Sequence, residues 1–212
     1  MDKPVIIFGA AGVGKMALEI FQSNGVVVYG FLDADKTRHS QEIDSIPILG
    51  DPEDHGFLKL IGKKCEAFVA TDDNKIRKNQ VEMLMEERKV MPTNAVHKSA
   101  SISGSVAIGH GNFIAAGVHV GPDTKIGQHC MLNTAVVVEQ DCEVGDFVQI
   151  GAGSIINGGV KIGKNVFVGS GVVVVAGAEI GANARIGAGS VVVGNVEKGK
   201  TVFGNPAVNI EK

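Results

Sequence analysis

The second half of the chain carries a hydrophobic pattern with a period of six residues. Counting from Ile102, every sixth residue up to Val192 is aliphatic, sixteen times without a break. A second column, four positions after the first, holds small or β-branched residues, and only Asn112 is out of character there. Because a helix repeats every 3.6 residues and a strand every two, a period of six predicts an internal repeat instead.

Each hexapeptide is expected to form one short strand and one corner. Glycine often follows the aliphatic position, and we expect the chain to bend there, since a bend favours a residue without a Cβ or with a positive φ. These glycines are Gly109, Gly121, Gly127, Gly145, Gly151, Gly163, Gly169, Gly181 and Gly187. Three six-residue sides make a triangular coil, so the spacing predicts a parallel β-helix without fixing its hand.

The first hundred residues show a different pattern. The apolar run 5–8 precedes a glycine turn, and helical spacing of apolar residues follows the turn as far as Gly25. Further apolar runs predict strands at 26–33 and 67–71, and a one-sided apolar pattern predicts a helix over 73–88. This outline is typical of a small, Rossmann-like α/β domain with about four strands.

Composition agrees with two domains, which we place at 1–96 and 97–212. Residues 1–101 hold eight of the 29 glycines, and only 15 of the 43 charged residues lie beyond residue 100. The absence of tryptophan suits the narrow interior of a β-helix.

Charge, cysteine content and hydropathy exclude several classes of protein. The net charge is −3 with both signs mixed, so no basic surface is available for a nucleic acid. Three cysteines without paired spacing argue against a structural zinc site, so we expect no metal and a reducing compartment, the cytoplasm. No stretch approaches the roughly 18 apolar residues of a membrane span, so we expect neither membrane insertion nor a secretory signal.

The glycine turn offers a site for a phosphate group. Segment 9–15 follows the Walker pattern until Met16, where a Ser or Thr should hold magnesium, so a P-loop ATPase is disfavoured. The backbone amides from Gly12 to Gly14 can face a phosphate, and Asp33, nineteen residues beyond Gly14, can bind a ribose hydroxyl. A domain of about four strands fits a single nucleotide better than a dinucleotide.

The segments VAIG, TKIG, CEVGD, VKIG, AEIG and ARIGAGSVV, with the closing GNPA, resemble those of the hexapeptide-repeat acyltransferases, whose β-helices are left-handed. Together with the small nucleotide-binding domain, they make nearly the whole chain similar to the NeuD/PglD family of bacterial sugar acetyltransferases. The resemblance implies a homotrimer, with acetyl-CoA as co-substrate along the β-helix. It also implies a nucleotide-linked sugar, commonly a UDP-amino-sugar, on the first domain.

The turn and the resemblance together define two sets of candidate ligand-binding residues. The nucleotide-sugar set comprises Gly9, Gly12, Val13, Gly14, Asp33, Asn74 and Asn133. The acetyl-CoA set comprises Gln149, Gly151, Gly158, Asn205, Pro206 and Ala207. Family members often carry a histidine at the position of Val13, and Asp72 adds a negative charge near the expected anion.

The catalytic segment departs from the family at its most informative position. The family pattern NT-x-x-x-x-[DE]-H-[DE]-C matches from Asn133 to Cys142, except that Gln140 replaces the histidine. The resemblance implies that this histidine acts as a general base, which takes a proton from the acceptor. A glutamine amide has no lone pair that titrates near neutral pH, so it cannot do the same. The catalytic candidates are therefore Gln140 and the flanking carboxylates of Glu139 and Asp141.

Three explanations for Gln140 remain open. The acceptor is an amine that needs only positioning, or another group acts as base, or the protein binds its ligands without catalysing transfer. The alternative bases are the two flanking carboxylates, His119 and His129. The residues expected above and below Gln140 in the stack, Pro122 and Gly158, are not basic, and His119 lies roughly 10 Å from Pro122 by strand rise.

These observations predict an acetyl-CoA-dependent acetyltransferase of polysaccharide biosynthesis. Its acceptor is a nucleotide-linked amino-sugar or a related surface sugar, with N-acetylation favoured over O-acetylation. The alternative is a catalytically impaired homologue that serves as a ligand-binding or scaffold protein, and a purely structural β-helix is a further possibility.

Overall fold

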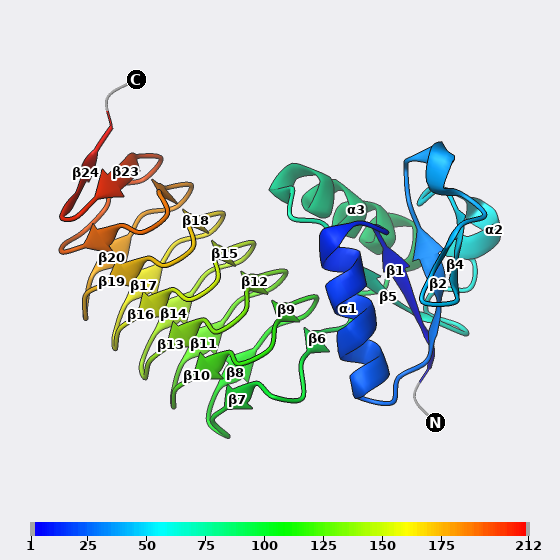
Figure 1. Cartoon of the computed structure of the whole chain (residues 1–212), viewed down its shortest axis with the longest axis horizontal. Coiled ribbons are helices and arrows are strands. Elements are labelled where there is room, and N and C mark those ends of the chain that lie inside the picture. The colour runs from blue at the N-terminus through cyan, green and yellow to red at the C-terminus, as the bar shows by residue number, and fades with distance from the viewer. Residues whose placement is uncertain (1–2, 211–212) are drawn as a thin grey trace. The chain divides into compact units, whose positions relative to one another are not determined.

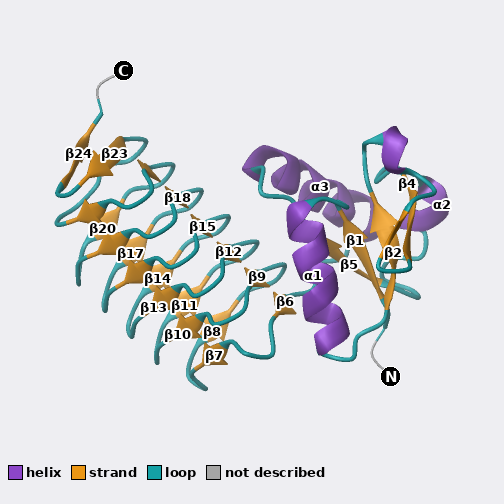
Figure 2. Cartoon of the chain, in the orientation of Figure 1, coloured by secondary structure: helices purple, strands orange, loops and turns teal. Residues whose placement is uncertain are grey.

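The computed structural model describes residues 3–210, which divide into two compact units between Lys98 and Ser99. All described helices lie in the first unit, and the second consists of short strands and turns (Figures 1 and 2). None of these helices is both long and apolar enough to cross a membrane.

The first unit contains a five-stranded sheet in the order β3-β4-β2-β1-β5. Strands β4, β2, β1 and β5 are parallel, and β3 pairs antiparallel with β4. The elements are β1 (Val5–Phe8), α1 (Gly12–Ser23), β2 (Val28–Leu32), the 3-10 helix η1 (Lys36–Arg38), β3 (Glu42–Ile43), β4 (Ile46–Gly50), α2 (His55–Leu58), β5 (Glu66–Val69), α3 (Asn74–Arg88) and β6 (Ala95–Val96). The order β4-β2-β1 is that of one Rossmann half, and β5 takes the place of the first strand of the other half, which confirms the predicted fold class.

Burial and capping explain these elements. All four residues of β1 are buried, as expected for a central parallel strand covered on both faces. Helix α3 begins after Asp73, whose carboxylate accepts hydrogen bonds from the Lys75 and Ile76 amides. The predicted helix over 73–88 is therefore confirmed to within one residue.

Two parts of this unit differ from the sequence expectation. The predicted strand 26–33 shortens to β2, and the predicted strand 67–71 becomes β5, which begins one residue earlier and ends two residues earlier. The hairpin β3–β4 and the short helix α2 were not predicted. Pro47 interrupts the apolar pattern of β4, and four residues are too few for a helical period to show.

The second unit is a parallel β-helix built from two-residue strands. Its sheets run β7-β10-β13-β16-β19-β22, β8-β11-β14-β17-β20 and β9-β12-β15-β18-β21-β23-β24. The strands are β7 (Ser101–Ile102), β8 (Ala107–Ile108), β9 (Phe113–Ile114), β10 (His119–Val120), β11 (Lys125–Ile126), β12 (Met131–Leu132), β13 (Val137–Val138), β14 (Glu143–Val144), β15 (Gln149–Ile150), β16 (Ile155–Ile156), β17 (Lys161–Ile162), β18 (Phe167–Val168), β19 (Val173–Val174), β20 (Glu179–Ile180), β21 (Arg185–Ile186), β22 (Val191–Val192), β23 (Thr201–Gly204) and β24 (Ala207–Asn209). Paired residues are one eighteen-residue coil apart, as in Val120 with Val138. From Ile114 to Val192 the aliphatic column is buried, whereas Ile102 and Ile108 in the first coil are half-buried.

The corners lie two residues after the glycines at which the sequence predicted them. Every sixth residue from Gly111 to Gly189 has a positive φ, including non-glycine residues such as Ala135 and Asp141. The glycines that follow the aliphatic column serve another purpose. A Cβ on Gly151, for example, would lie 2.4 Å from the Ser170 nitrogen of the next coil. Close stacking therefore requires these glycines, and the expectation of a bend there was wrong.

Polar residues of the second column are hydrogen-bonded inside the stack, which explains Asn112. All of them except Ser190 donate to a carbonyl fifteen residues ahead, and several accept from an amide eighteen residues ahead. The donor pairs are Asn112 to Gly127 (3.0 Å), Thr124 to Glu139 (2.7 Å), Cys130 to Gly145 (3.1 Å), Cys142 to Asn157 (3.2 Å) and Ser154 to Gly169 (2.9 Å). The acceptors are Asn112, Thr124 and Ser154, which take the amides of Cys130, Cys142 and Val172. These bonds join successive coils beneath the corners.

Replacing Thr124 tests this bonding pattern. Thr124→Val keeps the shape of the side chain but leaves the Glu139 carbonyl and the Cys142 amide without their partner. We expect the free energy of unfolding, measured by denaturant titration, to fall by about 1–3 kcal/mol. Thr124→Ser keeps the hydroxyl and should lose much less. Equal losses in the two variants would show that packing of the methyl group, not hydrogen bonding, matters at this position.

Candidate functional site

A cavity of about 280 Å³ lies where β1, β2 and β5 end and α1 begins. It brings together four of the seven predicted nucleotide-sugar residues, namely Gly9, Gly12, Val13 and Asp33. Asp72 also lines it and places a carboxylate beside any anion bound there. The carboxyl ends of parallel strands are the usual ligand site of such sheets.

The three glycines of the turn have different structural roles. Gly9 has a φ of 109°, and a Cβ on Gly14 would lie 2.0 Å from the Gly9 carbonyl oxygen. These two glycines therefore allow α1 to pack against the end of β1. A Cβ on Gly12 would meet nothing within 4 Å. Ala11 supplies no side-chain cap to α1, so the first-turn amides remain available to an anion at the positive end of the helix.

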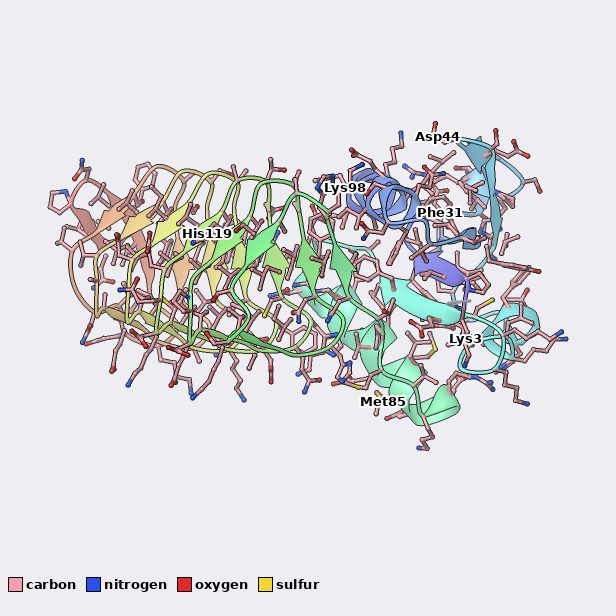
Figure 3. The ribbon with its side chains drawn as sticks, turned by 90° about the horizontal axis from the view of Figure 1, so that it is seen from below. Lys3, Phe31, Asp44, Met85, Lys98 and His119 are labelled. Carbon is pink, nitrogen blue, oxygen red and sulfur yellow. The ribbon has the colours of Figure 1, made fainter. Side chains whose placement is uncertain are left out.

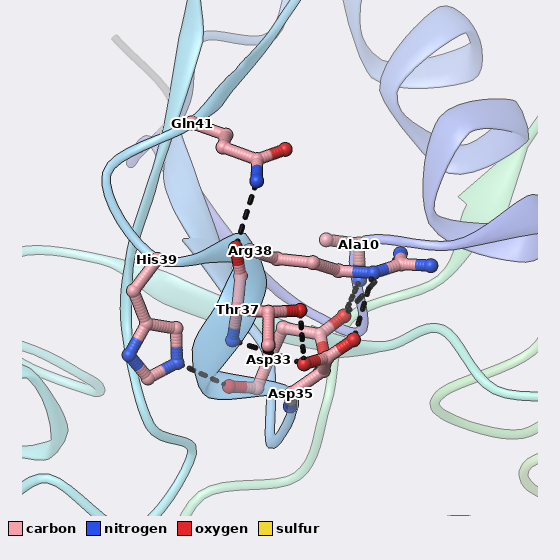
Figure 4. A network of polar contacts seen from close by, with 7 residues as sticks. All are labelled: Ala10, Asp33, Asp35, Thr37, Arg38, His39 and Gln41. Atoms are coloured by element: carbon pink, nitrogen blue, oxygen red, sulfur yellow. Dashed lines mark hydrogen bonds and ion pairs between the residues drawn. The ribbon is translucent and has the colours of Figure 1, made fainter.

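Asp33 holds the glycine turn in place (Figure 4). Its Oδ2 accepts a hydrogen bond from the Ala10 amide at 2.7 Å, and its Oδ1 accepts one from the Asp35 amide at 2.9 Å. His39 Nε2 lies 2.7 Å from the Asp33 carbonyl oxygen. The carboxylate retains further lone pairs for a ligand, but the contacts in the structure bind it to the protein backbone.

A charged turn continues this network (Figure 4). The Asp35 carboxylate caps η1 through the amide and hydroxyl of Thr37, and these hydrogen bonds lower the pKa of Asp35. The Arg38 guanidinium lies 3.4 Å from the Asp35 carboxylate and 4.0 Å from that of Asp33. The turn after β2 is therefore held rigidly beside the cavity.

Asn74 does not line this cavity. Its Oδ1 accepts a hydrogen bond from the buried guanidinium of Arg77, which also donates to the Thr71 carbonyl at 2.6 Å. This pair fixes the loop between β5 and α3. In place of Asn74, the cavity is lined by Pro52, Ile76 and Gln80. These three come from segments that no motif connects to the glycine turn, and only the fold shows their position.

The catalytic candidates Glu139, Gln140 and Asp141 form a corner between β13 and β14. Asp141 occupies one of the left-handed corner positions, with a φ of 58°. Its amide donates to the Pro122 carbonyl at 3.0 Å, and the Gln140 carbonyl accepts from the Gly159 amide at 2.9 Å. The corner is therefore bonded to the coils on both sides, in the stacking order that the sequence predicted.

The side chain of Gln140 lies over Gly158 of the next coil. A Cβ on Gly158 would be 2.5 Å from Gln140 Nε2 and 3.0 Å from Gln140 Cδ, so a larger residue there would displace the amide. The structure thus brings a catalytic candidate and an acetyl-CoA candidate into contact. Asn133 uses its Nδ2 to bond the Ile150 carbonyl at 2.9 Å, and in this way supports the neighbouring coil.

One of the alternative bases, His129, is buried, and so is the thiol of Cys142 at the end of the catalytic segment. The His129 side chain is buried and packs on the Phe147 ring at a centroid distance of 4.9 Å, so it is not accessible to an acceptor. Burial raises the pKa of the Cys142 thiol, which keeps it protonated near neutral pH. His119, labelled in Figure 3, is exposed on β10. Among residues 3–210, no three His, Cys, Asp or Glu side chains are grouped so as to hold a metal ion.

The acetyl-CoA candidates lie in two places within the second unit. Gln149 on β15, Gly151 after it and Gly158 are half-buried residues of the middle coils. Asn205 and Pro206 form the exposed turn of the hairpin β23–β24, and Ala207 begins β24. The structure does not join these places into a single cluster.

Family models match both units of the chain. The PglD N-terminal domain matches residues 4–84, and the bacterial transferase hexapeptide of six repeats matches residues 123–158 and 159–194. The chain is therefore an acyltransferase-type protein with a PglD N-terminal domain in its first unit and hexapeptide repeats in its second.

Solved structures place it more narrowly. A histidine-to-alanine mutant of GDP-perosamine N-acetyltransferase from Caulobacter crescentus, in complex with CoA and GDP-perosamine, is 33% identical with a TM-score of 0.91, covering 99% of this chain and 97% of that one. The acetyltransferase domain of PglB from Neisseria gonorrhoeae, in complex with acetyl coenzyme A, is 26% identical with a TM-score of 0.89, covering 99% and 100%. WeeI from Acinetobacter baumannii is 25% identical with a TM-score of 0.86, covering 98% and 99%. The chain belongs to the NeuD/PglD-like family of sugar acetyltransferases, and its β-helix is left-handed.

Removing the Asp33 carboxylate tests its structural role. In Asp33→Ala the Ala10 amide, in a residue only 1% exposed, loses its acceptor. We expect the unliganded protein to lose about 1–3 kcal/mol of unfolding free energy in a denaturant titration. Asp44→Asn, an exposed substitution in the β3–β4 turn, is the control and should leave the stability unchanged. If Asp33→Ala is as stable as the original chain, the carboxylate does not hold the turn.

Proposed function

We propose that the protein transfers an acetyl group from acetyl-CoA to the amino group of a nucleotide-linked amino-sugar used in polysaccharide biosynthesis. The observation that supports the proposal is the contact between Gln140, the predicted catalytic residue, and Gly158, a predicted acetyl-CoA residue. On the first unit, the cavity beside the uncapped start of α1 suits the nucleotide phosphates.

The relatives support both ligands. The Caulobacter crescentus enzyme is named as an N-acetyltransferase, and mutants in which a histidine is replaced by alanine or asparagine are described with CoA and GDP-perosamine bound. Ligand binding in that protein therefore survives the loss of a histidine. By analogy, we infer that Gln140 in this chain permits binding of both substrates.

An amine acceptor fits Gln140 better than a hydroxyl does. A neutral amine attacks a thioester with its own lone pair and can lose its proton afterwards, whereas a sugar hydroxyl needs a base during attack. The Gln140 amide can hold the acceptor by hydrogen bonds, and the half-buried Glu139 and exposed Asp141 leave carboxylates nearby for the later proton.

We also propose a homotrimer. On strands β13, β16, β19 and β22 of the first sheet, the outward residues are Val137, Ile155, Val173 and Val191. The second sheet carries Lys125, Glu143, Lys161 and Glu179 at the corresponding positions. An apolar face of this kind suits a contact with a second copy, and the charged face suits solvent. The three cysteines are free, which agrees with a reducing location such as the cytoplasm.

The second candidate function is ligand binding without transfer, and the observation that favours it is Gln140 itself. A general base contributes a factor of about 10²–10⁴ in rate, so a site without one is slow for any acceptor that requires it.

Gln140→His separates the two candidates. We expect the original chain to release CoA thiol from acetyl-CoA in the presence of nucleotide-linked amino-sugars. The variant should be faster, by up to about 10²-fold, because imidazole can take the acceptor proton. Its advantage should shrink below about pH 6.5, where imidazole becomes protonated and can no longer act as a base. Thiol release by the variant alone would instead establish the impaired homologue.

His119→Asn tests whether a histidine from a neighbouring subunit supplies the base. With Gln140 as a positioning group, the rate should be unchanged within about twofold. A fall of 10²-fold or more at constant KM would show that His119, supplied across a subunit contact, acts as the base.

The trimer is tested by light scattering. We expect a mass near three times the 22.0 kDa of one chain. Ile155→Asp places a charge on the apolar face and should give the monomer mass, because an unpaired charge is costly to bury. Glu143→Gln on the charged face is the matched control and should remain trimeric. A monomeric original chain would refute this assembly.

A further inference from the structure

A second cavity, of about 330 Å³, continues the one at the glycine turn. The two cavities share Ala34, Pro52, Ile76 and Gln80 in their walls, so a ligand that begins at the start of α1 can extend into the second. Asp51, Glu53, Asn79 and Met83 complete the second cavity. Its volume and its place beyond the phosphate end suit a nucleoside.

The walls of this cavity are apolar enough to hold a flat ring. Ala34, Pro52, Ile76 and Met83 supply carbon surface, and Ile76 is 49% exposed although it lies on α3 beside the cavity. Covering such a side chain with a base removes apolar surface from water and gives the ring a fixed plane.

The charged groups in these walls are all acids. Neither cavity is lined by a lysine or an arginine, whereas Asp51 and Glu53 lie on the second. Asp51 is already oriented, because its Oδ1 accepts the Glu53 amide at 2.9 Å and its backbone carbonyl accepts the Asp54 amide at 3.1 Å. Its other carboxylate oxygen has no hydrogen bond from the described residues.

Gln80 lines both cavities and can become a further acceptor when its side chain turns toward a bound base. Its Oε1 is buried and has no hydrogen-bond partner among the described residues. A buried oxygen in this state costs about 1–3 kcal/mol, so the side chain gains free energy when a ligand brings it an N–H group. The acidic walls and the unpaired Gln80 oxygen both favour a ligand whose edge carries several N–H donors.

We propose that this second cavity is the nucleobase site and that it selects guanine, through the Asp51 carboxylate and the Gln80 amide oxygen. This inference rests on the proposed function, because it names the base of the nucleotide-linked sugar. Guanine presents adjacent N1–H and N2–H₂ donors, which match two acceptor oxygens. Uracil and thymine present a single N–H between two carbonyl oxygens, which the carboxylates repel. Adenine and cytosine place an acceptor beside their amino group, so one of the two matches is lost.

Nucleotide binding to the full-length chain, measured by calorimetry, tests the assignment. GDP should bind roughly ten- to a hundredfold more tightly than UDP, dTDP, ADP or CDP, the range expected for one well-matched base contact. Asp51→Asn should abolish most of this preference, because its amide can turn an N–H donor toward the N1–H of guanine. UDP binding to this variant should not weaken. Gln80→Leu should also weaken GDP binding but leave the melting temperature unchanged or higher, since it removes an unpaired oxygen.

Asp44→Asn is the control for charge and folding, since this residue lies in the exposed β3–β4 turn with a φ of 48° that asparagine adopts readily. It should leave all five affinities unchanged. UDP binding as tight as GDP binding would overturn the guanine assignment while leaving a nucleotide-sugar substrate in place. A GDP preference that survives both cavity variants would overturn the location. Failure of all five nucleotides to bind would overturn the proposed function itself.

Discussion

The second unit depends on the hydrogen bonds between coils one turn apart. The Val137 amide reaches the Ser154 carbonyl and the Glu139 amide reaches the Ile156 carbonyl, each at 2.9 Å, and the same spacing recurs along the unit. Each residue consequently lies against its counterparts in the coils above and below. The interior must then keep a constant width, which aliphatic residues fill and larger aromatic residues would not. Abundant glycine, absent tryptophan and sparse charge all follow from this one requirement.

The same constraint determines how the candidate catalytic corner is held. The Glu139 carbonyl accepts from Thr124 below it, and the Gln140 carbonyl accepts from Gly159 above it. Cys142, just past the corner, joins the set through the Thr124 hydroxyl and the Asn157 carbonyl. None of these contacts uses the side chain of Gln140. The backbone therefore fixes the position of this residue, and a histidine or a glutamine can occupy it without a change of scaffold.

The β-helix could be predicted almost residue by residue, whereas the first unit could be predicted only in outline. A six-residue period is repeated sixteen times, so each position is specified many times over. The corners were misplaced because the stacking glycines, such as Gly151, are more regular in sequence than the left-handed residues, which include Ala135 and Phe147. In the first unit, Asp33 was placed beside the glycine turn from its spacing. Its bond to the Ala10 amide and the approach of Gln80 depend on tertiary packing, which no local pattern encodes.

Gln140 narrows the range of acceptors that the proposed reaction can use. An amine with a pKa near that of an α-amino group, about 7.7–8.0, is neutral in roughly one molecule in ten at pH 7. Without a base to deprotonate it, such an acceptor has a concentration of reactive neutral amine about tenfold below its total concentration. This difference corresponds to roughly 1.4 kcal/mol. Positioning next to the thioester can offset far more than this, because well-oriented groups gain about 7–11 kcal/mol. A neutral hydroxyl is a much weaker nucleophile than a neutral amine, so a hydroxyl acceptor would lose the full contribution of a general base. An amino-sugar acceptor is thus compatible with the proposed reaction at Gln140, whereas an oxygen acceptor would require a base supplied by another residue.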